Sequence, residues 1–574
     1  MSKRLAGHYS KFDAPARAQL KLEILGILAS EPQRTVRKGT VGVAAVLLKQ
    51  DPEWPELWQF IAAASQDAHP DARELSFWLL QEMTDTVGEH LKGHFQDLSR
   101  LFQRGLEDTD HKVQTAAVKA LGQLMSYLAE EPEIEMFCRL LPPLLQVAAT
   151  CAQQHDEDTV AVVLDVFYDL SFSPSSFFVR YMQDIINFSL VIMNSSDLEI
   201  GVRDSAALIV ATLAESKPKT FGKDEALVAR VLDTLFGLIE NSPSSAAGAL
   251  FESNPAWRDD VEDNDDEFDS PTETSMAQGT MDMLACEIPK KYIFQPIVSR
   301  CVSRLSSPNV GARKAGIAGL GVIAEGCAEP LREHLADIMP LVFGAAGDPD
   351  AQVRECACFA LGQLSEHCRP EILGYSEQIL PIVFLLLDDA TVTVQATSCY
   401  VLEMFCERLE PEAVRPLLDP LVRKLAAMLE ATNKRSVQEM VVAALAATAV
   451  AAEDEFAPYV NGVAALMAKL MALTEERMYS LRGRALECMG HMAIAVGKEA
   501  FQPYFLVTMQ CAMEGLTFDS TDLHEFAYAL FANLAKVMGE EFAPVLPELV
   551  PHLIQVIGAD EGQLEAVQDA EQVS

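Results

Sequence analysis

The residues best suited to binding another molecule are concentrated in one acidic stretch. Eight carboxylates occur within eleven residues, namely Asp259, Asp260, Glu262, Asp263, Asp265, Asp266, Glu267 and Asp269. Such a run repels itself and cannot bury a core, so an exposed insert is expected here. Its carboxylates could engage Lys and Arg side chains of a partner, with Trp257 as an apolar anchor beside them. The alternative is a solvated linker.

Several residue patterns resemble catalytic or nucleotide-binding motifs, but their spacing or their structural context does not match those motifs. Gly490 to Lys498 resembles a phosphate-binding loop, but six residues separate its glycines where the motif has four. A dinucleotide-binding fingerprint follows a β-strand, but no strand is predicted before Gly316 to Gly321. His367 beside Cys368 is more typical of a helix end than of a nucleophilic pair. The sequence therefore predicts no enzymatic activity and no cofactor.

The twelve cysteines are scattered and form no C-x-x-C pair, so neither a zinc site nor a disulfide framework is predicted. A reducing compartment suits this pattern. The first ten residues lack an apolar signal core, and the longest apolar stretch, Met440 to Ala452, is too short to span a bilayer. We expect a soluble intracellular protein with no membrane insertion.

Net charge narrows the choice of partners. The chain has 44 Lys and Arg against 84 Asp and Glu, which gives a formal charge of −40. Long-range attraction then favours basic partners, and direct binding of nucleic acid is not expected. An alternative interpretation is that the acidity only keeps a large helical surface soluble.

The elements that must position these residues come from one recurring helix, seen most clearly in Val353 to Glu366. Most of its copies lie 41 to 45 residues apart, and one interval is 110 residues. This period is typical of paired helices in a HEAT or armadillo solenoid, so we predict an all-α superhelix. Equivalent positions are Ala44, Leu80, Leu121, Val166, Val210, Leu320, Leu361, Leu402, Leu445, Met489 and Leu530.

A polar pattern accompanies the repeat. An Asp in the turn stands six residues before an Arg on the second helix at Asp67/Arg73, Asp197/Arg203 and Asp348/Arg354, while Asp108 and Asp389 precede Gln114 and Gln395 by the same offset. Stacked units would place these groups at one height, where each can reach its neighbour and satisfy turn backbone groups. We interpret them as a structural ladder between repeats and not as a catalytic acid and base.

The long interval sets the predicted organisation. Residues 1–240 form N-terminal HEAT repeats, 241–280 an acidic disordered insert within a repeat, 281–558 regular HEAT repeats, and 559–574 a polar tail. A helix pair is expected around Met281 to Arg304. Later first helices are expected to start near six prolines, since proline is favoured at a helix start. These are Pro340, Pro381, Pro420, Pro458, Pro503 and Pro544.

Four segments carry a family resemblance: Met281 to Ala285 with Pro289, Arg313 to Gly316, Leu320 to Gly326, and Phe359 to His367. They resemble the importin-β (karyopherin-β) family, and within it the importin-4 branch. The resemblance extends from about Phe12 to Val550. Family members are much longer, so it implies a partial chain.

The resemblance implies a nuclear transport receptor that moves between cytoplasm and nucleus through the nuclear pore. It would bind basic cargo such as ribosomal proteins and histones, contact Phe-Gly nucleoporins, and release cargo to the GTPase Ran with GTP. A monomer is expected. The acidic insert with Trp257 would bind cargo or the basic face of Ran, and pockets for Phe side chains would lie between adjacent outer helices.

Two other solenoid classes fit less well. A phosphatase scaffold tends to have uniform repeats without a long acidic insert. A tubulin-binding array would need basic edge loops, and the formal charge of −40 on this chain argues against that class.

Overall fold

The computed structural model describes residues 9, 11–128, 130–172, 176–243 and 272–554. Within these ranges the secondary structure is α-helix and 3-10 helix, with no strand, which confirms the predicted all-α fold. The described residues form two compact units. The first contains residues up to 239 together with 272–297, and the second contains 240–243 together with 298–554.

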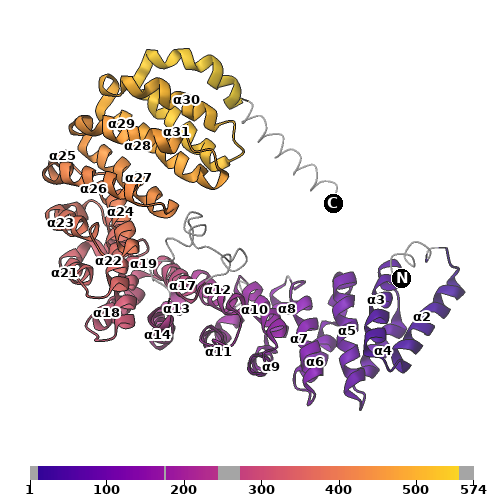
Figure 1. Ribbon diagram of the computed structural model, residues 1–574. Coiled ribbons are helices and arrows are strands. Elements are labelled where there is room, and N and C mark those ends of the chain that lie inside the picture. The colour runs from indigo at the N-terminus through magenta and orange to yellow at the C-terminus, as the bar shows by residue number, and fades with distance from the viewer. Residues whose placement is uncertain (1–8, 10, 129, 173–175, 244–271, 555–574) are drawn as a thin grey trace. The chain divides into compact units, whose positions relative to one another are not determined.

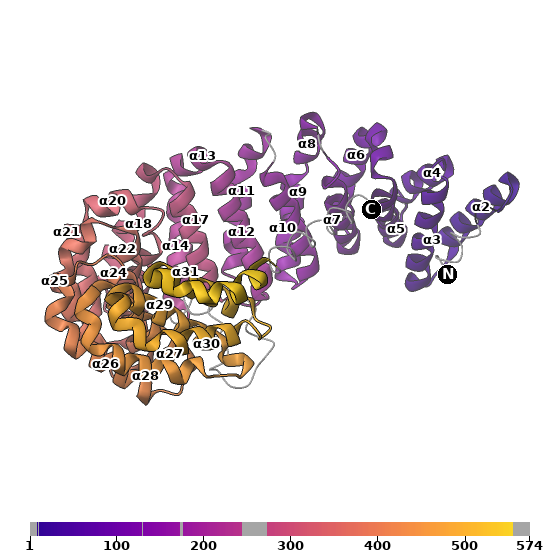
Figure 2. The same cartoon turned by 90° about the horizontal axis from the view of Figure 1, so that it is seen from above.

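The first unit is a stack of helix pairs (Figures 1 and 2). The second helices α3, α5, α7, α10, α12 and α17 pack on one another in that order, and α2, α4, α6, α9 and α11 each pack on their own second helix. The bounds are α2 (Ala14–Ser30), α3 (Arg34–Gln50), α4 (Pro55–Ala64), α5 (Pro70–Val87), η1 (Gly88–His94), α6 (Phe95–Leu106), α7 (His111–Met125), α8 (Glu131–Cys138), α9 (Leu141–Gln153), α10 (Glu157–Ser171), α11 (Ser176–Met193), α12 (Ile200–Ser216), α13 (Pro218–Lys223), α14 (Glu225–Asn241) and α17 (Glu273–Glu287).

The second unit repeats this arrangement, with α19, α22, α24, α27, α29 and α31 as successive second helices (Figure 1). The bounds are α18 (Lys290–Leu305), α19 (Val310–Val322), α20 (Ala328–Glu333), α21 (Leu335–Ala346), α22 (Ala351–His367), η2 (Glu371–Tyr375), α23 (Ser376–Leu386), α24 (Val392–Cys406), α25 (Pro411–Val414), η3 (Arg415–Leu417), α26 (Leu418–Ala431), α27 (Arg435–Ala452), η4 (Glu453–Tyr459), α28 (Val460–Met471), η5 (Glu476–Met478), α29 (Tyr479–Phe501), η6 (Gln502–Tyr504), α30 (Phe505–Gly515), α31 (Thr521–Met538) and η7 (Gly539–Val545).

The recurring apolar position is the centre of this packing. All eleven equivalents, from Ala44 to Leu530, lie on second helices and are at most 3% exposed. Each larger member contributes about 1.5–3 kcal/mol by leaving water. The predicted period is therefore confirmed as the spacing of the core.

Glycines let the second helices approach closely. A Cβ added at Gly362 of α22 would lie 2.2 Å from Cε1 of Tyr400 on α24. The ring cannot move away freely, because its hydroxyl accepts a 2.7 Å hydrogen bond from Gln363 Nε2. Small residues on these helices are therefore a packing requirement.

We expect Gly362→Val to lower the free energy of unfolding by about 1–3 kcal/mol, because the extra atoms overpack the α22–α24 contact. Gly374→Val is the matched control, since a Cβ there has no atom within 4 Å. Chemical denaturation of both variants provides the comparison. Equal midpoints for the two would contradict this account of the interface.

The two helices predicted around Met281 to Arg304 are present as α17 and α18, but they belong to different repeats and do not form a pair. Helix α17 packs on α12 in the manner of a second helix, so it belongs to the repeat that α14 begins. Gly316 of α19 lies against the carbonyl oxygen of Cys301, so α18 is the first helix of the next repeat. The sequence misled because a long insert separates two helices of one repeat and leaves helices of different repeats adjacent.

The prolines agree with expectation in part. Helices α26, α28 and α30 begin within two residues of Pro420, Pro458 and Pro503, as predicted. Pro340 and Pro381 are the sixth residues of α21 and α23 and do not start these helices. Shorter helical segments, α20 and η2, lead into both helices, so each helix begins before its proline. A proline at this depth removes one intrahelical hydrogen bond.

In the described part of the chain, no single helix has the length and apolar character to cross a membrane. The bent pair α8 and α9 meets that test only when the two are taken together.

Candidate functional site

The acidic residues and Trp257 singled out in the sequence lie outside the described residues. The predicted site, Asp259 to Asp269 with Trp257, therefore stays a prediction. The described residues form three other arrangements of interest. These are a polar ladder, an acidic pocket in the second unit and an apolar pocket in the first.

The ladder joins adjacent repeats as predicted. Arg354 on α22 donates from Nε and Nη2 to the two carboxylate oxygens of Asp389 in the next repeat, at 2.7 and 2.9 Å. Its Nη1 also donates to the carbonyl oxygen of Asp348 in its own turn, at 2.9 Å. Each arginine therefore satisfies its own turn and holds the next one.

The same pattern recurs through both units. Bidentate pairs also join Arg73 to Asp108 and Arg313 to Asp348. Arg203 instead pairs with Glu273 at 2.6 Å and donates to the Met193 carbonyl oxygen. Glutamines at this position bond to their own turn, from Gln114 to Asp108 O, from Gln395 to Asp389 O and from Gln438 to Thr432 O.

Electrostatics agree with a structural role for the ladder. Hydrogen bonding from Arg354 lowers the pKa of Asp389, and the bond to Asp389 raises the pKa of Arg354. Both groups are thus charged across the physiological range. Their side chains are only 17% and 8% exposed, so the pair is screened little by solvent.

The acidic pocket lies where the turns before α29 and α31 meet the start of α27. Four exposed carboxylates line it, Glu475, Glu476, Asp519 and Asp522, together with Tyr479 and the guanidinium groups of Arg435 and Arg477. The cavity measures about 630 Å³.

The cations of this pocket are already engaged. Arg477 pairs with Glu475 at 2.9 Å. Arg435 is buried, hydrogen-bonds to the carbonyl oxygen of Arg477, and lies 3.7 Å from Glu439. The mouth is therefore negatively charged, and its chemistry suits a Lys or Arg side chain from a partner.

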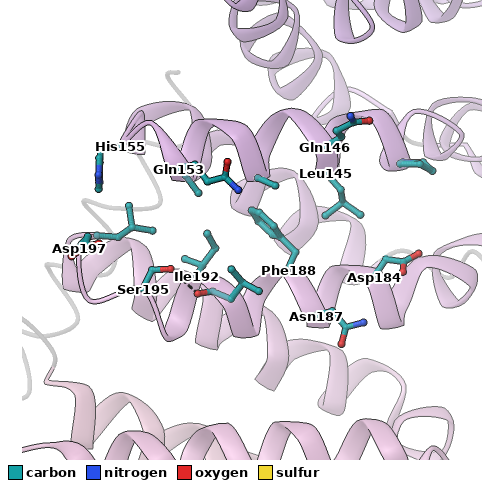
Figure 3. Close-up of a pocket in the computed structure, with 15 residues that line it drawn as sticks. Leu145, Gln146, Gln153, His155, Asp184, Asn187, Phe188, Ile192, Ser195 and Asp197 are labelled. Atoms are coloured by element: carbon teal, nitrogen blue, oxygen red, sulfur yellow. Dashed lines mark hydrogen bonds between the residues drawn. The ribbon is translucent and has the colours of Figure 1, made fainter.

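The apolar pocket lies between α9 and α11, the first helices of two consecutive pairs (Figure 3). Leu145 of α9 faces Phe188 and Ile192 of α11 across it. Phe188 is 8% exposed, while Val191 at the rim is 63% exposed. Polar residues bound the two ends, with His155 and Asp197 at one and Asp184 and Asn187 at the other.

This pocket of about 720 Å³ has apolar walls and enough room for an aromatic side chain. The hydroxyl of Ser195 donates to the Val191 carbonyl oxygen at 2.8 Å and so closes the last turn beside it. Sequence reasoning expected pockets between first helices but could not locate them. It missed the acidic pocket, although paired acidic residues at equivalent turns, Glu475–Glu476 and Asp519–Asp522, were a readable signal.

Comparison with known proteins bears on this architecture. A family model described as IPO5-like, TPR repeats, matches residues 32–188, and one described as a HEAT-like repeat matches 311–364. A probable importin subunit beta-4 of Schizosaccharomyces pombe is 28% identical over 97% of this chain and 51% of its own length. Importin-4 of Homo sapiens is 26% identical over 98% of this chain and 52% of its own.

This chain is similar to proteins named as importins. Its fold agrees, because the crystal structure of Kap121p superposes with a TM-score of 0.80 at 23% identity, covering 96% of this chain and 53% of that one. Kap121p has also been solved bound to Pho4p and bound to Nup53p. The chain spans about half the length of the curated relatives that it matches.

Proposed function

We propose that this protein acts in nuclear transport as a receptor for basic cargo. The observation that carries the proposal is its similarity, over 97% of its length, to a protein named as an importin subunit. The formal charge of −40 supports basic cargo, for which ribosomal proteins and histones are the proposed classes. Kap121p, which shares the fold, binds protein partners in its solved complexes.

Two acidic surfaces would share cargo binding. The insert at 259–269 supplies a dense run of carboxylates. The pocket around Glu476 and Asp522 supplies carboxylates at fixed positions on the fold. A tethered acidic segment raises the local concentration of negative charge, while a fixed pocket sets the position of a cationic side chain. Release by Ran with GTP and passage between cytoplasm and nucleus complete the proposal.

The experiment is binding of the purified chain to a Lys/Arg-rich histone or ribosomal-protein segment, with and without Ran–GTP. We expect binding that weakens with salt and is reversed by Ran–GTP, and that weakens when the eight insert carboxylates are neutralised. Tight binding that Ran–GTP does not change would overturn the release step and favour a scaffold. No binding to any basic segment would overturn the cargo class.

The pocket between α9 and α11 is the proposed contact for Phe-Gly nucleoporins. Its apolar walls, Leu145, Phe188 and Ile192, would take a phenylalanine ring, and its exposed rim would allow weak, rapidly reversible binding. Kap121p, which shares this fold, has been solved bound to Nup53p.

We expect Val191→Asp to weaken binding of a Phe-Gly peptide by about tenfold or more, because it places a charge at the apolar rim. Leu208→Asp is the matched control, since Leu208 is 50% exposed on α12 and does not line the pocket. NMR titration or fluorescence anisotropy of a labelled peptide measures the effect. Equal affinities for both variants would show that nucleoporins do not bind at this pocket.

A further inference from the structure

Three metal-ligating side chains of different types converge in the first unit. His111 is the first residue of α7, Cys151 lies in the last turn of α9, and Asp156 is the N-cap of α10. One ligand atom from each lies within 4.8 Å of the others, and His111 Nε2 is 4.0 Å from Cys151 Sγ. The set therefore offers one nitrogen, one sulfur and one oxygen to a single point.

The imidazole of His111 is oriented for this role. Its Nδ1 is 3.4 Å from Gln114 Oε1, and Gln114 is in turn held by a 2.8 Å bond from its Nε2 to the Asp108 carbonyl oxygen. An amide oxygen accepting from Nδ1–H selects the tautomer that leaves the Nε2 lone pair facing Cys151. Metal-binding histidines almost always have such a partner on the second ring nitrogen.

The other two groups are also held in place. Cys151 is fully buried on α9. Burial, followed by the charge of Asp156, raises the pKa of its thiol to about 11, so a metal ion must displace the thiol proton in order to bind. Asp156 accepts from the backbone N–H of Thr159 at 3.3 Å and from its hydroxyl at 2.8 Å, which fixes the carboxylate as a helix cap. Each carboxylate oxygen has a second lone pair for a metal.

The position in the stack is informative. Where Arg73 and Arg354 reach the following repeat with a guanidinium, the corresponding residue of α7 is Gln114, which bonds to its own turn and to His111. His111, Cys151 and Asp156 thus span the same repeat-to-repeat boundary that an Arg–Asp pair spans elsewhere in the ladder.

We propose that His111, Cys151 and Asp156 bind a zinc ion that joins the α6–α7 repeat to the α9–α10 repeat. A mixed nitrogen, sulfur and oxygen set suits Zn²⁺, whereas Ca²⁺ and Mg²⁺ take oxygen ligands. Tetrahedral zinc places N and S about 3.6 Å apart, so the observed 4.0 Å closes with a small side-chain adjustment. Zinc would take the cysteine as a thiolate, releasing its proton to solvent.

The site is reachable, with room for a fourth ligand. His111 and Asp156 line an open cavity together with Thr115 and Lys119. A water molecule entering from this side would complete the tetrahedron. The sequence predicted no zinc site because the ligands are separated by 40 and 5 residues and match no compact motif.

The test is titration of the reduced, metal-free full chain with Co²⁺, which substitutes for zinc and gives a near-ultraviolet charge-transfer band only when a thiolate binds it. We expect one Co²⁺ per chain, displaced by Zn²⁺, with the band abolished in Cys151→Ser. The matched control is Cys138→Ser, since Cys138 is also buried and has its pKa raised to about 11 by burial. Circular dichroism establishes that both variants fold.

Two further variants separate coordination from packing. His111→Ala should lose the visible d–d bands of tetrahedral Co²⁺, and Gln114→Ala should weaken affinity by about 10- to 100-fold while the band shape is retained. Absence of a thiolate band in the wild type, or its survival in Cys151→Ser, would overturn the proposal. Neither result depends on transport activity.

Discussion

Replacing Arg354 with alanine is expected to destabilise the second unit by about 3–5 kcal/mol, because it strands a buried carboxylate and frees a turn carbonyl. Asp389, at 8% side-chain exposure, would lose two hydrogen bonds from the guanidinium. The carbonyl oxygen of Asp348 would lose a third. In a repeat stack the loss falls mainly on the two repeats that share the pair.

Hydrogen exchange measured by mass spectrometry is the appropriate readout, because it resolves individual helices. Protection should fall in α22 and α24, while α5 and α7, joined by the separate Arg73–Asp108 pair, should keep theirs. Arg423→Ala is the control, since this arginine is 76% exposed and pairs within its own helix. Unchanged protection at α22 and α24 would show that the ladder does not stabilise the stack.

The ladder shows what sequence alone could establish. Its offset of six residues, like the period of the apolar position, is set by helix geometry within one repeat. Such local geometry depends on residues that are close together in the sequence and can therefore be predicted from them. Arg73 and Arg354 were therefore paired with the correct turns. Arg203 was not fully anticipated, because its partner Glu273 comes from beyond the long insert.

The two pockets could not be read in the same way. Glu475 and Asp522 lie in different repeats. Acidic residues do recur at their turns, but no local pattern shows that the two turns border one cavity. The apolar pocket depends on how far α9 and α11 are separated, which follows from packing of whole side chains such as Phe188. Sequence favoured the insert at 259–269 because its charge is contiguous, whereas the charge of the pocket is assembled by the fold.

Reversing the charge of the acidic pocket is expected to weaken binding of a Lys/Arg-rich segment by about 10- to 100-fold. The triple variant Glu475→Lys, Glu476→Lys and Asp522→Lys replaces attraction by repulsion at three sites around one cavity. Arg477, which pairs with Glu475 in the wild type, would lose that partner and add to the repulsion. Fluorescence anisotropy over a range of salt concentrations measures both the affinity and its electrostatic share.

The matched control for this variant changes net charge equally but away from the pocket. Glu23, Asp97 and Glu107 are exposed in the first unit, and reversing them shifts the formal charge by the same amount. If the pocket positions a cationic side chain, only the pocket variant shows the loss of affinity of about 10- to 100-fold. Its affinity also falls less steeply with salt concentration than that of the wild type. Equal losses in both variants would mean that the chain attracts basic partners by total charge alone, and that the pocket around Glu476 does not select them.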